Sequence, residues 1–417
     1  MRQDRIEPRC AIEALRAGIP NRDVVRQLPP LQQDLESRLN ALLEEAEAGW
    51  ESGRQAPGIL LEGEFGTGKS HWLEYARHRA LEEGFVCSTV VLNKETPLHD
   101  LGKIYRASVE AAAAPGKLGP ALDEIAHGSQ PESLPLHREM MEWAHNKPGL
   151  DPRFAATLML FERSPNDDLR AKIVAEWTGY PMKILELRAA LKEIGEAQRY
   201  PVARPQKGHL IQRFEFITRF FHSAGYAGWV VLFDEAEMVS RYSLRQRGRA
   251  YAHLSQLLGL DKATSVPGLA TVFTITKDYT GQVLYGRKND IEAIPARLAG
   301  TRDEPYIHAA QSGMNAIKGK GVDLRSPTRV QVDEVYTKVR AIYGAAYQWS
   351  APDLETRREY TSSTGLRQYI RSWINAWDLR RLYDVASDVV METVEMSYEE
   401  DTDLQHEEPD EEPSFML

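Results

Sequence analysis

The sequence feature that most constrains the fold is GEFGTGKS at residues 63–70. It fits the pattern G-x-x-x-x-G-K-[ST], in which glycines let backbone N–H groups turn inward around phosphate oxygens. Residues 57–62 form a turn and a short apolar strand pattern, and residues 71–83 form a helical pattern that ends before Gly84. Strand, loop and helix together predict a phosphate-binding loop whose helix directs its positive end at the anion. A glycine turn with an incidental lysine is the alternative, and this context disfavours it.

The side chains of this loop supply the remaining chemistry. Lys69 would place a compact positive charge on the β- and γ-phosphates, and the Ser70 hydroxyl would bind Mg²⁺. The motif therefore predicts a nucleoside triphosphate with Mg²⁺ as its ligand. The expected nucleotide-binding residues are Gly63, Glu64, Phe65, Gly66, Thr67, Gly68, Lys69, Ser70 and His71, together with Thr276.

Two carboxylates follow a second buried strand pattern. Residues 229–233 are continuously apolar and are followed by Asp234 and Glu235. Ligands bind at the carboxyl ends of strands in α/β sheets. We therefore expect Asp234 to hold Mg²⁺ and Glu235 to orient and deprotonate an attacking water. A core strand that ends in solvated acids is the alternative, which the phosphate loop disfavours.

Several further residues are candidates on weaker patterns. The strand pattern at 269–276 ends in Thr276, which either contacts the γ-phosphate or water, or is a threonine favoured by β-propensity. Arg297 is either an arginine finger that acts on a neighbouring subunit or an ordinary surface arginine. Three more arginines recur every four residues on one predicted helix face: Arg241, Arg245 and Arg249. This face would contact a phosphate, a DNA backbone or only solvent.

The chain of 417 residues is long enough for two or three substructures. We expect an N-terminal helical segment at 1–55, an ATPase-like core at 56–325 and a C-terminal helical segment at 326–397. Within the core, residues 97–205 have mostly helical patterns and predict a helical insertion. Residues 398–417 hold nine acidic residues and no lysine or arginine. They predict a disordered, solvated tail, with a docking or autoinhibitory role as the alternative.

Composition disfavours several classes of protein. The two cysteines, Cys10 and Cys87, lie far apart without metal-ligand spacing, which argues against a disulfide framework or a zinc site. No apolar run reaches membrane-spanning length, and the first residues lack a signal region, so we expect a cytoplasmic protein. Most of the net charge of −10 comes from the acidic tail. The near-neutral remainder neither demands nor excludes nucleic-acid binding.

These motifs together resemble the AAA+ (ASCE-like) division of P-loop NTPases. The loop matches Walker A, WVVLFDEAE matches Walker B, FTIT matches a sensor-1 strand, and Gly365-Leu366-Arg367 matches the sensor-2 pattern G-x-R. The resemblance implies an α/β fold with a parallel-sheet core and a C-terminal helical lid. It also implies ATP and Mg²⁺ as ligands, ATP hydrolysis, a possible homo-oligomer, and contact of Arg367 with the γ-phosphate.

A narrower resemblance covers about residues 8–390. AIEALRAGIPNRDVV, the Walker A loop, DEAE and RAIYGAAYQW are similar to the ATP-binding proteins (D component) of BREX-type phage-defence systems. This resemblance implies a bacterial anti-phage ATPase that remodels or loads a partner, a DEAD/DEAH-box helicase, on DNA. The alternatives are a slow-turnover nucleotide-dependent switch or scaffold that controls partner docking, and a DNA-binding regulator. A small-molecule kinase is disfavoured, because the acid pair suits activated water better than a bound acceptor.

Overall fold

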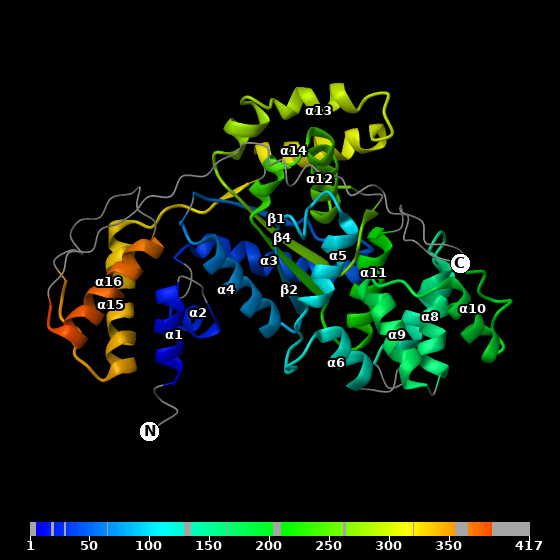
Figure 1. The fold of residues 1–417 in the computed structure, drawn as a ribbon, viewed down its shortest axis with the longest axis horizontal. Coiled ribbons are helices and arrows are strands. Elements are labelled where there is room, and N and C mark those ends of the chain that lie inside the picture. The colour runs from blue at the N-terminus through cyan, green and yellow to red at the C-terminus, as the bar shows by residue number, and fades with distance from the viewer. Residues whose placement is uncertain are drawn as a thin grey trace.

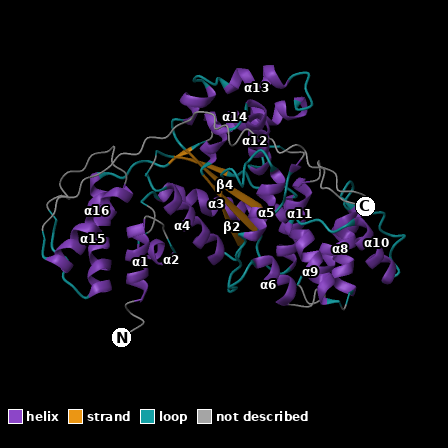
Figure 2. Ribbon diagram, in the orientation of Figure 1, coloured by secondary structure: helices purple, strands orange, loops and turns teal. Residues whose placement is uncertain are grey.

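A parallel β-sheet lies at the centre of the computed structural model (Figures 1 and 2). Within the described residues the strand order is β2-β3-β4-β1-β5, and every neighbouring pair is parallel. This confirms the predicted α/β class with a parallel sheet. The strands are β1 (Ile59–Glu62), β2 (Val86–Val91), β3 (Trp229–Asp234), β4 (Leu269–Ile275) and β5 (Val322–Asp323). The structure describes residues 6–17, 21–28, 31–64, 66–128, 135–164, 166–202, 210–261, 264–319, 321–354 and 366–385.

The register of the sheet brings the ends of β1 and β3 to one edge. Phe273 of β4 lies between Leu60 of β1 and Phe233 of β3. The rings of Phe233 and Phe273 stack with their centroids 4.4 Å apart. Because the three strands are parallel and in step, the loop after β1 and the acids after β3 leave the sheet on the same side.

Both faces of the sheet are buried, which explains the continuous apolar sequence of β3. Val230 and Leu232 pack into one core with the apolar faces of two helices. Val231 and Phe233 alternate with them and pack into the core of the opposite face. The helices on the first face are α3 (Gln33–Ser52) and α4 (Lys69–Glu82).

Helices from two parts of the chain cover the opposite face. The described residues between β2 and β3 are mainly helical and hold α5 (Leu101–Glu110), α6 (Ala121–Gly128), α7 (His137–Asn146), α8 (Pro152–Arg163), α9 (Asp167–Thr178), α10 (Ile184–Glu193) and α11 (Leu210–Ser223). A second group follows β3 and lies at the top of Figure 1: α12 (Leu244–Leu257), α13 (Asp290–Leu298) and α14 (Ile307–Gly319). Residues of both groups contribute to one continuous core.

The first and last described helices form a separate bundle at the left of Figure 1. Its members are α1 (Ile6–Ala17), α2 (Arg22–Gln27), α15 (Arg329–Tyr347) and α16 (Leu366–Tyr383). Ile12 of α1 packs into the same apolar core as Trp373 and Trp377 of α16. α2 connects this bundle to the core of the sheet, because its Val24 packs in the bundle and its Val25 packs with residues of α3. The expected N-terminal helical segment 1–55 therefore contributes to two apolar cores. The acidic segment 398–417 lies outside the described residues.

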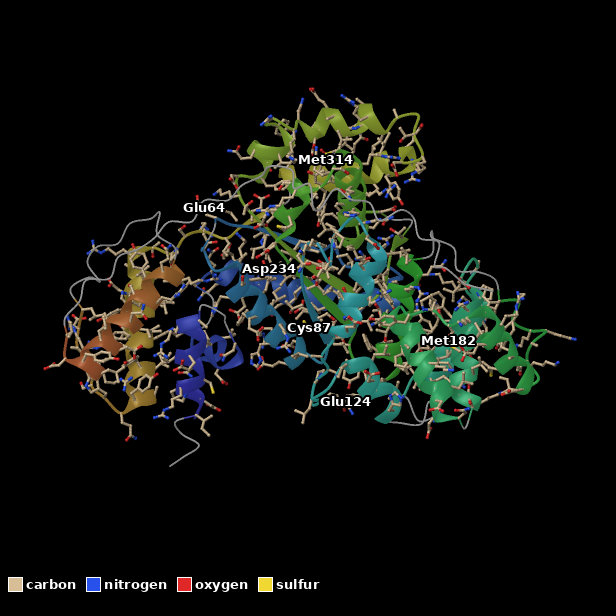
Figure 3. The ribbon with its side chains drawn as sticks, in the orientation of Figure 1. Glu64, Cys87, Glu124, Met182, Asp234 and Met314 are labelled. Carbon is tan, nitrogen blue, oxygen red and sulfur yellow. The ribbon has the colours of Figure 1, made fainter. Side chains whose placement is uncertain are left out.

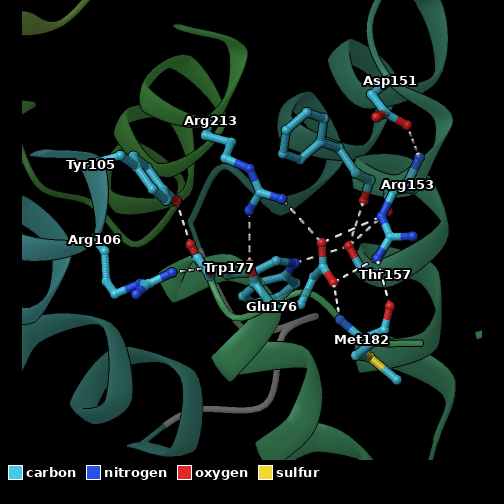
Figure 4. A network of polar contacts seen from close by, with 11 residues as sticks. Tyr105, Arg106, Asp151, Arg153, Thr157, Glu176, Trp177, Met182 and Arg213 are labelled. Atoms are coloured by element: carbon cyan, nitrogen blue, oxygen red, sulfur yellow. Dashed lines mark hydrogen bonds and ion pairs between the residues drawn. The ribbon is translucent and has the colours of Figure 1, made fainter. Parts of the chain in front are cut away.

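A buried ion pair holds the helices between β2 and β3 together (Figure 4). Arg153 of α8 donates from Nη2 to Glu176 of α9 at 2.7 Å, and both side chains are almost fully buried. Arg213 of α11 donates from Nη1 to the Glu176 carbonyl at 2.9 Å. The Met182 carbonyl accepts a further bond from Arg153 at 3.2 Å. Arg213 Nη2 also lies 3.4 Å from Glu176 Oε1, so one carboxylate links α8, α9 and α11.

We predict that Glu176→Ala lowers the free energy of unfolding by about 3–5 kcal/mol, because it leaves the buried Arg153 guanidinium without its counter-ion. Urea titration followed by tryptophan fluorescence measures this loss. Glu186→Ala is the matched control, since Glu186 pairs with Lys172 at the surface of the same helical region. It should change stability little. Equal effects of the two substitutions would contradict the prediction.

Candidate nucleotide site

The loop between β1 and α4 has the backbone that its glycines permit. Gly66 and Gly68 adopt positive φ values of 81° and 103°, in the left-handed region that favours glycine. At Gly63 an added Cβ would lie 2.7 Å from the Thr67 hydroxyl, so a side chain does not fit there. Gly68 caps the N-terminus of α4 without a side-chain hydrogen bond, which leaves the first N–H groups of the helix facing the loop. Phe65 lies outside the described residues.

Lys69 is buried at the base of this loop. Its Nζ donates to the carbonyl oxygens of Gly63 at 2.8 Å and Glu64 at 3.2 Å. Burial lowers the pKa of Lys69, and the carboxylates of Glu237 and Asp234 oppose that shift. The amine is therefore held inside the loop by backbone carbonyls and by the charge of nearby acids.

Asp234 is the point at which three segments meet at the sheet edge; Figure 3 labels it, together with Glu64 of the loop. Its Oδ2 accepts a hydrogen bond from the Ser70 hydroxyl at 2.9 Å. Its Oδ1 accepts bonds from the Thr274 hydroxyl of β4 and from the Glu235 backbone N–H. A carboxylate beside a hydroxyl is the kind of oxygen pair that binds Mg²⁺ together with phosphates and water. The two side chains thus fit the metal expected from the sequence.

Glu235 occupies an unusual backbone conformation. Its φ is 64°, in the left-handed region, which is uncommon for a residue with a long side chain. Its N–H donates to Asp234 Oδ1 at 3.0 Å and to the Thr274 hydroxyl at 3.2 Å. Burial and the charge of Asp234 raise the pKa of Glu235, and Lys69 opposes the shift. The residue remains exposed, so its carboxylate is accessible beside a fixed Asp234.

Glu237 is a site residue that the sequence analysis missed. It lies in the 3₁₀ helix η4 (Ala236–Arg241), and only 4% of it is exposed. Its Oε2 has no hydrogen-bond partner among the described residues. Burial raises its pKa to about 7, while the charge of Lys69 acts in the opposite direction. The only signal in the sequence was a third acid in DEAE, which a solvated turn would also explain.

A largely apolar pocket joins the glycine-rich loop to the bundle of terminal helices. Gly66, Thr67 and Gly68 line it from the loop, and Arg367 lines it from the first turn of α16. The structure therefore brings Arg367 to the same pocket as the loop. The remaining walls, which no sequence motif indicates, include Leu15, Val24, Leu28, Leu31, Gln32, Leu35, Val335 and Ile370.

His71 connects the loop helix to the terminal bundle. Its Nε2 lies 2.8 Å from the Leu28 carbonyl at the end of α2. A carbonyl oxygen only accepts, so Nε2 carries the proton. Burial lowers the pKa of His71, although this hydrogen bond opposes the shift. His71 lines the pocket, but its Nε2 is already engaged by the protein.

The other residues that the sequence predicts for the site do not line the pocket, and two of them pair with a carboxylate of the protein. Thr276 is buried just past β4, and its contact with the γ-phosphate or water stays a prediction. Thr274, two residues earlier, contacts Asp234. Arg297 is exposed in the last turn of α13 and does not line the pocket. Arg241 lies in η4, outside α12, so the three arginines predicted to share one helix face do not lie on one helix. The other two are paired within the fold. Arg245 and Arg249 both bind the buried carboxylate of Asp303, each with a nitrogen–oxygen distance of 2.9 Å.

Two absences among the described residues bear on ligands and membranes. They contain no group of three or more His, Cys, Asp or Glu side chains arranged to hold a metal ion. A Mg²⁺ site that uses one carboxylate, one hydroxyl and phosphate oxygens would not form such a group. Among these residues there is also no helix long and apolar enough to cross a membrane.

The fold and site define a parallel α/β protein in which a glycine-rich loop before a helix lies beside two carboxylates. A comparison with protein families matches residues 5–127 and 206–375 to the family described as BREX system ATP-binding protein BrxC/D. These segments make up most of the chain, and the chain therefore belongs to this family. The matched segments include the loop, the acids after β3 and Arg367, and they leave 128–205 unmatched. Neither curated proteins nor solved structures gave a match.

We predict that Glu237→Gln removes the part of the pH dependence of folding stability that comes from the Glu237 carboxyl group. The folded protein keeps the Glu237 proton up to about pH 7, whereas an ordinary glutamate releases it near pH 4.5. Stability therefore falls as pH rises between these values, by up to about 3 kcal/mol, and remains lower above pH 7. The variant should match wild type at pH 4 and be more stable at pH 8 in thermal melts.

The exposed residue Glu334 of α15 supplies the control for this experiment. Glu334→Gln should change stability by a similar, small amount at both pH values. If Glu237→Gln behaved like this control, the carboxylate of Glu237 would not hold its proton in the folded protein.

Proposed function

We propose that the chain is an AAA+ type P-loop ATPase that hydrolyses ATP to ADP and phosphate. The observation that carries this proposal is the contact between Ser70 and Asp234, which joins the two halves of the site. The loop N–H groups and the start of α4 would bind the phosphates, and Lys69 would neutralise their charge. Asp234 and Ser70 would hold Mg²⁺, which when bound neutralises charge on the β- and γ-phosphates.

The strand order supports a role for Glu235 in activating water. β4 lies between β1 and β3, so the strand that ends in the loop is two strand spacings, about 10 Å, from the strand that ends in the acids. The Ser70–Asp234 contact bridges this spacing, so Lys69 and Glu235, the residues beside them in sequence, would act on the same γ-phosphate and attacking water. The raised pKa of Glu235 favours its action as a proton acceptor. Arg367, on the pocket wall, would contact the γ-phosphate from the lid.

Family membership supports a role in bacterial phage defence. We propose that nucleotide turnover remodels or loads a partner, with a DEAD/DEAH-box helicase as the candidate, on DNA in the cytoplasm. The helices α7–α10 are the best candidate for partner specificity, because residues 128–205 fall outside the family match. Their surface can vary between relatives without change at the nucleotide site.

A nucleotide-dependent switch is a second candidate function. It is favoured by the position of Arg297, which is exposed on α13 and does not line the pocket of its own subunit. A monomer without a neighbour's arginine would bind ATP and turn it over slowly. Nucleotide binding between the loop and the terminal bundle would then set the position of the lid and control partner docking.

We predict that Glu235→Gln reduces ATP hydrolysis on the order of 10²-fold or more and preserves ATP binding, because only the water-activating group is lost. Lys69→Ala should abolish binding itself. Phosphate release and fluorescent-nucleotide titration measure the two effects, with Glu334→Gln as the surface control. Hydrolysis at the wild-type rate by Glu235→Gln would exclude Glu235 as the base.

Mixing of variants tests whether Arg297 acts across subunits. Arg297→Ala should slow turnover on the order of 10³-fold if it is an arginine finger. Lys69→Ala lacks a working pocket but keeps Arg297, so adding it to Arg297→Ala should restore part of the activity. If the mixture is no faster than its parts, Arg297 does not act in trans, and the switch is favoured.

A further inference from the structure

The pocket beside the glycine-rich loop is lined by two residues with unused hydrogen-bonding atoms. The side-chain oxygen Oε1 of Gln32 and the indole nitrogen Nε1 of Trp72 are both buried, and neither has a hydrogen-bond partner among the described residues. Polar atoms buried without a partner are costly, so they indicate a place where a ligand or water completes the bonding. Both residues stand among mostly apolar walls.

The orientation of the Gln32 amide is fixed by the protein. Its Nε2 donates to the backbone carbonyl of Arg325 at 2.9 Å, and a carbonyl oxygen can only accept. The free atom of Gln32 is therefore the acceptor Oε1. The indole of Trp72 can only donate. Gln32 and Trp72, both on the pocket wall, thus supply one acceptor and one donor without a partner among the described residues.

We propose that Gln32 makes this pocket selective for adenine by accepting a hydrogen bond from the exocyclic amino group of the base. The inference rests on the proposed nucleotide site. Adenine carries an amino donor at position 6, next to ring nitrogens that only accept and suit the Trp72 donor. Guanine and hypoxanthine carry a carbonyl oxygen at position 6. That oxygen would face Gln32 Oε1 as a second acceptor and leave both atoms unsatisfied.

The surroundings of Gln32 suit a purine ring. Leu31 and Leu35 flank it in sequence and line the same pocket, and Ile370 of α16 adds an apolar surface from the lid. Gly66 and Gly68 also line the pocket, so the walls around Gln32 are continuous with the phosphate-binding loop. A single nucleotide could therefore place its phosphates at the loop and its base beside Gln32.

Titration of ATP and inosine triphosphate against the full chain with Mg²⁺ tests this proposal. The two nucleotides differ at position 6 of the base. Wild type should bind ATP roughly tenfold more tightly, the value of about one buried hydrogen bond. Gln32→Met should bring the ratio close to one, chiefly through weaker ATP binding. Gln33→Met, at the exposed neighbouring position, should keep the wild-type ratio.

Two results would overturn the proposal. One is equal binding of the two nucleotides by wild type. The other is a loss in Gln32→Met that affects both nucleotides alike, because that would reflect only the lost bond to the Arg325 carbonyl. Lys69→Ala separates this failure from failure of the nucleotide site. If Lys69→Ala bound both nucleotides as wild type does, the site itself would be wrong, whatever Gln32 does.

Discussion

The arrangement of the site depends on the hydrogen bonds of one carboxylate. Asp234 accepts from Ser70 of the loop helix, from Thr274 of β4 and from the backbone of Glu235. These bonds tie the loop after β1, the end of β3 and the end of β4 into one polar cluster at the sheet edge. The cluster also holds Glu235 at a positive φ, a strained conformation that persists only where the surroundings enforce it. Such strain at an exposed acid is typical of functional positions.

The sequence predicts those parts of the fold and site that depend on local patterns. The apolar run at 229–233 predicts β3, and the alternation of its side chains between two buried faces explains why that run is unbroken. The glycine spacing predicts the loop. Contacts between distant segments could not be predicted in this way. Gln32 lies before α3, without a motif, and its amide binds the carbonyl of Arg325, which is far away in the sequence. Glu237 likewise depends on burial, which one more acid in the sequence does not reveal.

The terminal helices form part of the pocket wall and are attached to the loop helix. α1 and α2 share an apolar core with α15 and α16. α2 meets the loop helix through the Leu28 carbonyl, which binds His71, and through Val25, which packs in the same core as Trp72. The pocket has walls from the loop, from residues before α3 and from α16. A ligand that contacts the loop and Arg367 together would therefore stabilise one position of the whole bundle. Because α1 packs in the same core as α16, such a ligand would also stabilise the position of α1.

The helices between β2 and β3 divide along the boundary of the family match. α5 contacts β2 directly and lies in the matched segment 5–127, and α11 lies in the matched segment 206–375. α8 and α9 pack on α11 through Phe154 and Trp177, whose rings lie against Phe216. Among the described residues, α8 and α9 thus rest on α11, α9 also contacts α5, and α10 rests on α8. The buried ion pair between Arg153 and Glu176 fixes α8 against α9. Residues on the outer surface of these helices can therefore be substituted without altering α11 or the nucleotide site.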